Sequence, residues 1–156
     1  MKKICVILGL CLVAFAIMAA APANNSVHNT VASVSVTAQH DATTWTKADS
    51  VVMTYTDTCD AYIHASGTVT LQPEQTLYVS FAKDAGSLTT AQTYSPPEGA
   101  RDPLTLVFGN LYVDSLLSQT DRVDTIFLYL AVKGTGTGES VAVSSVYMTG
   151  TIIDRN

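Results

Sequence analysis

The densest group of potentially reactive side chains lies in the segment TDTCDAYIHASG, which spans residues 56–67. This segment contains Asp57, Cys59, Asp60 and His64. A cysteine nucleophile needs a base within reach, and a zinc ion needs three or four converging ligands. Because side chains alternate between the two faces of an extended strand, Cys59 and His64 are expected on opposite faces. We therefore interpret Cys59 as a small buried hydrophobic residue and predict no catalytic or metal site here.

The glycine-rich segment GTGTGE at 134–139 also resembles a chemical motif, the phosphate-binding loop. It is expected to lie between two strands, and no lysine or helix start follows it, so we interpret it as a turn. No aspartate-rich run has the spacing of a calcium-binding loop. The sequence thus predicts a protein that is not an enzyme and that carries no cofactor and no metal.

The first residues have the three-part layout of a secretory signal peptide. Lys2 and Lys3 precede a long apolar run that ends on small residues, and cleavage is expected after Ala23. Residues 1–23 are thus predicted to be the signal peptide and residues 24–156 the mature domain. We expect the mature protein in the periplasm, on the surface of a bacterial cell or secreted from it, with no membrane insertion after cleavage.

Charge and cysteine content narrow the choice of partners. The chain has 13 acidic and 8 basic residues and a formal net charge of -5. This excess of acid argues against nucleic acid and anionic membranes as partners, because both need basic patches. Cys5 and Cys11 leave with the signal peptide, so Cys59 remains as the single cysteine. No disulfide is expected within the mature chain, although an exported protein meets compartments that permit one.

β-branched residues are abundant, and their restricted side-chain rotation favours strands over helices. Apolar and polar residues alternate in several segments that are separated by turn residues. The pattern predicts an all-β chain, folded as a single β-sandwich or jelly-roll-like domain of about seven to nine mostly antiparallel strands. Residues 111–119 fit either a strand or a short helix, and the expected strands cover residues 31–38, 50–56, 67–72, 76–82, 104–109, 123–132 and 140–153.

The turns between these strands predict two hairpins. Residues 73–75 are expected to join the strands at 67–72 and 76–82, and the glycine-rich turn is expected to join the last two strands. Residues 83–103 hold three prolines and no periodic pattern, so we expect an irregular loop there. Long loops of this kind are often functional.

Two sets of residues are candidates for binding. Trp45 and Tyr94 lie in loop-like segments, and an exposed aromatic ring can stack on a sugar, so this pair is a candidate glycan or ligand site. Val34, Val36 and Ala38 share one face of the first expected strand. That strand either fills the core of its own domain or is donated to a neighbouring subunit by strand addition.

The layout is similar to that of exported fimbrial subunits, which combine a signal peptide, an alternating N-terminal strand and a final strand with a tyrosine, here Tyr147 in SSVYMTGTII. The similarity lies in this pattern and not in a specific motif, so it assigns no family. It implies a structural or adhesive surface protein that assembles by strand exchange, with copies of itself or with a partner subunit. The alternative is a secreted carbohydrate- or ligand-binding sandwich that uses Trp45 and Tyr94.

Overall fold

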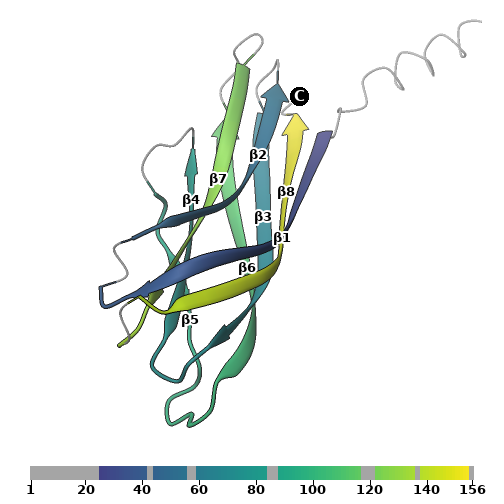
Figure 1. The fold of residues 1–156 in the computed structure, drawn as a ribbon. Coiled ribbons are helices and arrows are strands. Elements are labelled where there is room, and N and C mark those ends of the chain that lie inside the picture. Colours follow the sequence, from purple (N-terminus) through teal and green to yellow (C-terminus); the bar gives the residue numbers. More distant parts are fainter. Residues whose placement is uncertain are drawn as a thin grey trace, which may run out of the picture.

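The computed structural model describes residues 25–41, 44–55, 59–83, 88–116, 122–135 and 138–154, and the predicted signal peptide lies outside this part of the chain. The described residues contain no helix that is long and apolar enough to cross a membrane. They form eight strands (Figure 1). In chain order these are β1 (Asn25–Gln39), β2 (Thr46–Tyr55), β3 (Cys59–Leu71), β4 (Thr76–Lys83), β5 (Gln92–Tyr94), β6 (Leu104–Leu116), β7 (Arg122–Lys133) and β8 (Ser140–Asp154).

Strand pairing divides the strands between two sheets. One sheet has the order β1-β8-β3-β6, and the other has the order β2-β7-β4-β5. Pairing within each sheet is antiparallel. The sheets join at one corner, where the end of β1 runs parallel to β7 and Ala38 lies opposite Val132. A double sheet of eight strands in this order is a jelly roll, so the predicted all-β, jelly-roll-like fold is confirmed.

Both predicted hairpins are wrong, because the chain crosses between the sheets at these turns. β3 pairs with β6 and β8, whereas β4 pairs with β5 and β7. β7 and β8 likewise belong to different sheets. The turn after β3 is a corner. The backbone N–H of Gln72 donates to Oε1 of Gln75 at 3.0 Å, and Nε2 of Gln75 donates to Oε2 of Glu139 at 2.9 Å. Turn residues indicate where the chain reverses, but not to which sheet it returns.

The extent of two strands also differs from the prediction. β6 continues through the stretch that fitted either a strand or a helix, and it ends at Leu116. β5 lies inside the segment predicted to be irregular, and Leu88 in the same segment forms a bridge with Ala82 of β4. The expectation of a loop without strands is therefore wrong. A strand of 3 residues is too short for an alternating pattern to reveal it.

One irregularity bends the β1-β8-β3-β6 sheet. The register between β3 and β8 shifts between Ser66 and Thr68. A β-carbon on Gly67 would lie 2.7 Å from the ring of Phe108, so the sheet can approach this ring only where a side chain is absent. On β8, Ser145 has a φ angle of 52°. Such bulges increase the local twist of a strand, and Figure 1 shows β1 and β8 curving along their length.

The hydrophobic core lies between the two sheets. Ile126, Leu128, Leu130 and Val132 form the inward face of β7 and are each 0% exposed, as their alternation predicts. Cys59 is also 0% exposed, which confirms its interpretation as a buried hydrophobic residue. The largest fully buried side chains come from both sheets and include Phe81, Phe108, Met53, Ile63 and Leu71.

Candidate functional site

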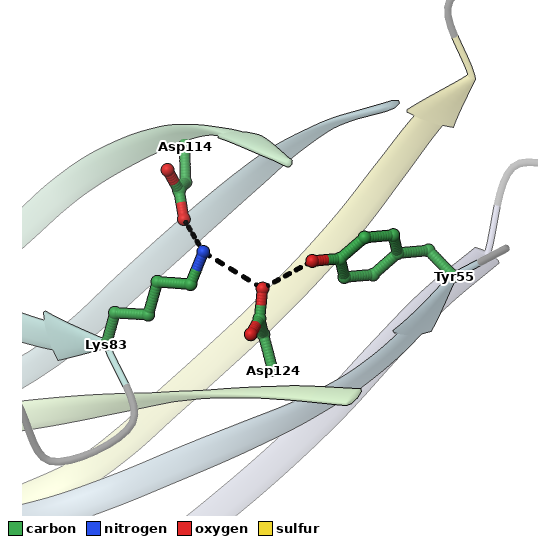
Figure 2. A network of polar contacts seen from close by, with 4 residues as sticks. All are labelled: Tyr55, Lys83, Asp114 and Asp124. Atoms are coloured by element: carbon green, nitrogen blue, oxygen red, sulfur yellow. Dashed lines mark hydrogen bonds and ion pairs between the residues drawn. The ribbon is translucent and has the colours of Figure 1, made fainter. Parts of the chain in front are cut away.

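Four side chains from four strands meet at one end of the sandwich, and Figure 2 shows the Lys83 amine between two carboxylates. Nζ of Lys83 lies 2.9 Å from Oδ2 of Asp114 and 3.0 Å from Oδ2 of Asp124. The hydroxyl of Tyr55 donates to Oδ2 of Asp124 at 2.7 Å. We call these four residues the Lys83 cluster. It is a compact polar network at the end of an apolar core.

Strand ends bring the cluster together. Tyr55 is the last residue of β2 and Lys83 the last of β4, while Asp124 lies near the start of β7, which runs between these strands. Asp114 comes from β6 and therefore from the opposite sheet. Asp124 lies two residues before Ile126 on β7, so its side chain is on the same inward face of the strand and is also buried. The contact between Lys83 and Asp114 thus links the two sheets across the end of the core.

The cluster holds charge where little water reaches it. The side chain of Asp124 is 1% exposed, that of Asp114 19% and that of Lys83 28%. Burial by itself lowers the pKa of Lys83, but its hydrogen bonds to Asp114 and Asp124 outweigh burial and raise that pKa above its usual value. Burial, reinforced by the charge of Asp114, also raises the pKa of the neighbouring Tyr112. The raised pKa of Lys83 therefore favours an ammonium group between the carboxyl groups of Asp114 and Asp124.

The arrangement can act as a clamp between the sheets. Removing one partner of a buried ion pair leaves a charge uncompensated, and this strongly destabilises the folded state. Within the described part of the chain, no group of three or more His, Cys, Asp or Glu side chains could hold a metal ion. The cluster was missed in the sequence because its members are far apart in the chain, and Asp114 falls in the stretch left unassigned.

The reactive segment at 56–67 divides between two faces, as its alternation predicts. Cys59 and Ile63 are buried in the core, whereas Tyr62 and His64 are exposed on the outer face of β3. Asp57 lies outside the described residues. The structure therefore does not bring Cys59 and His64 together.

Tyr94 and Trp45, the candidate ligand-binding pair, lie apart on the β2-β7-β4-β5 sheet. Tyr94 ends β5, while Trp45 precedes β2, and β7 and β4 run between these strands. The hydroxyl of Tyr94 donates to the carbonyl oxygen of Gly109 in β6 at 2.6 Å, and its ring lies 5.9 Å from that of Phe108. Tyr94 thus joins the edge strands of the two sheets. A ligand-binding role of this pair stays a prediction.

Val34, Val36 and Ala38 lie on β1, which pairs with β8 of the same chain from Asn25 opposite Ile152 to Thr37 opposite Ser140. Val36 and Ala38 are each 0% exposed, and Val34 is half-buried against the core. In this structure the strand therefore fills its own domain. Donation of the strand to a neighbour stays a prediction.

An apolar surface that the sequence did not indicate covers the outer side of β6. Val107 is 75% exposed, Leu111 58% and Val113 49%, and Tyr62 of β3, directly opposite Val113, is 38% exposed. We call these four residues the β6 face. β6 is the terminal strand of its sheet. Exposed apolar residues gathered on one face of a strand are candidates for a surface of interaction.

Comparison with known proteins finds similarity only at the level of structure. No protein-family model matches the chain, and no curated protein matches it. The crystal structure of the infectious bursal disease virus VP2 subviral particle matches with a TM-score of 0.56 and 13% identity, over 85% of this chain and 33% of that chain. The structure of the Gt strain of the same virus matches with a TM-score of 0.54 and 12% identity, over 86% and 34%.

These similarities define the class of the protein by its fold. It is an all-β domain whose jelly-roll-like fold resembles part of the VP2 chain of that virus. The chain spans about a third of the length of the two viral chains it matches. At 12–13% identity the likeness concerns the fold alone.

Proposed function

We propose that this chain is an exported structural protein whose copies associate with one another through the β6 face. The observation that carries the proposal is the exposure of three apolar side chains, Val107, Leu111 and Val113, on one side of a terminal strand. Interfaces between proteins are depleted of charged residues at their centre and enriched in aromatic residues such as Tyr62. The β3 residues opposite Leu111 and Val107 are His64 and Thr68, so neither position holds Asp, Glu, Lys or Arg.

The composition of the face is compatible with a second copy as the partner. The chain has a formal net charge of -5, and a contact through Val107, Leu111, Val113 and Tyr62 brings no carboxylates of these four residues together. The jelly roll is also the fold of VP2, which was solved as a subviral particle, and that protein therefore combines this fold with self-association. The export of this chain rests on its predicted signal peptide.

Association through the β6 face is favoured over the two alternatives from the sequence. Strand exchange in a fimbria-like assembly would require β1 to leave β8 and to withdraw Val36 and Ala38 from the core. A glycan site needs an available Tyr94, whose hydroxyl already bonds to Gly109. An adhesive role remains compatible with the proposal, because association of copies leaves the opposite sheet exposed.

Replacing Val107 and Leu111 together by lysine is expected to raise the dissociation constant of the assembly by about tenfold or more, since each 1.4 kcal/mol corresponds to about a factor of ten. The matched control replaces Val52 and Val123, which are 51% and 53% exposed on the other sheet, by lysine. This control adds the same charge and is expected to associate as the unmodified protein does. Analytical ultracentrifugation of folded samples measures both. Equal association of the two variants would contradict the proposal.

A further inference from the structure

The Lys83 cluster contains more carboxylates than a simple ion pair needs. Either Asp114 or Asp124 alone would neutralise the Lys83 ammonium group, and both lie within 3.0 Å of Nζ. Asp124, at 1% exposure, is more deeply buried than Asp114, at 19%. A second carboxylate beside an amine can act as a general base and acid, because it can accept protons and return them.

We propose that Lys83 and Asp114 condense to an intramolecular amide, with Asp124 as the general base and acid. The proposal concerns a covalent modification of the folded chain and goes beyond self-association. The reacting atoms are Nζ of Lys83 and Cγ of Asp114, whose Oδ2 lies 2.9 Å from Nζ. The product would tie β4 of one sheet to β6 of the other.

The step balances without any external reactant. Asp124 first takes one proton from the Lys83 ammonium group and passes it to the Asp114 carboxylate, and the free electron pair on Nζ attacks Cγ of the acid formed in this way. The C–N bond forms, and the C–O bond to the Asp114 hydroxyl breaks. That hydroxyl leaves as water with a second proton from Nζ, passed on by Asp124. The amide keeps the third proton of Nζ, and Asp124 ends as the carboxylate it was at the start.

Geometry lowers the barrier to a condensation that is slow between separate molecules in water. Groups held in contact within one molecule react as if one were present at about 10⁵–10⁸ M, and the folded chain holds Nζ beside the Asp114 carboxyl group. The Tyr55 hydroxyl fixes Asp124 by donating to Oδ2, the oxygen that faces Nζ. The raised pKa of Lys83 keeps the amine protonated, and this is why the reaction needs Asp124 as a base. Because the reaction occurs once per molecule, a slow rate suffices.

Intact mass of the folded chain tests the inference. The unmodified sequence is expected to lose the mass of one water molecule, and a digest is expected to contain a branched peptide that joins Lys83 to Asp114. Lys83→Arg keeps the positive charge but removes the nucleophilic amine, so its mass should be that of the full sequence. Asp124→Asn removes the base and should slow or abolish the loss of water.

The matched control is Lys133→Arg, which changes an exposed lysine at the end of β7 and should still lose one water molecule. Circular dichroism verifies that each variant is folded. The full mass for the folded unmodified chain after prolonged incubation overturns the inference. Loss of water that persists in folded Lys83→Arg also overturns it, because the lost water then comes from another site. Neither outcome bears on association through the β6 face.

Discussion

Replacement of Lys83 by methionine is expected to lower the free energy of unfolding by about 3–5 kcal/mol. It removes the nitrogen that contacts Asp114 and Asp124, whether as an ammonium group or as the amide, and leaves the buried Asp124 carboxylate without that partner. Asp124, at 1% exposure, cannot recover the lost interaction from water. Methionine has a similar length, so the change removes charge and hydrogen bonds more than volume. Urea denaturation of the folded variant measures the loss as a shift in the midpoint.

Two further variants serve as controls for Lys83→Met. Lys133→Met removes a lysine from an exposed position and is expected to change stability by no more than about 0.5 kcal/mol. Lys83→Arg keeps a cation between the carboxylates and is expected to retain more stability than Lys83→Met. If Lys83→Met were no less stable than Lys133→Met, the cluster would not be a clamp between the sheets.

Val36→Asp is expected to unfold the domain or to lower its free energy of unfolding by more than about 4 kcal/mol. Val36 is 0% exposed within the core, and an unpaired carboxylate in such a position is among the most destabilising substitutions. Thr37→Asp is the control, because Thr37 is the next residue of β1 and is exposed. Thermal unfolding followed by circular dichroism compares the two.

This pair also distinguishes the two roles of β1. If β1 completes its own domain, Val36→Asp yields an unfolded or strongly destabilised monomer. If β1 is instead donated to a neighbour, the variant remains a folded monomer and loses only its ability to assemble. A well-folded monomer would therefore contradict the placement of Val36 in its own core.

Much of the fold could be predicted from the sequence, because alternation along a strand is a local property. The inward row of β7 and the burial of Cys59 follow from periodicity alone. The pairing of strands could not be predicted in this way. A hairpin and a crossing between sheets use the same turn residues, and the corner at Gln72 and Gln75 depends on a contact with Glu139 from a distant turn.

The candidate sites were harder to predict than the strands for a physical reason. Lys83, Asp114 and Asp124 come from three strands, and only the meeting of strand ends places them together. The β6 face was hidden because LTLVFGNLYVD is apolar on both of its faces, so its pattern does not show which face is inward. The register with β3, which places Phe108 opposite Gly67 and Val107 opposite Thr68, decides that Phe108 turns inward and Val107 outward.

The measurement that tests the central claim most directly is the mass in solution of residues 24–156 over a dilution series, determined by sedimentation equilibrium. Association through the β6 face predicts a mass of two or more chains at high concentration and a reversible return to a single chain on dilution, by mass action. A folded protein with the mass of one chain at every concentration would contradict the claim.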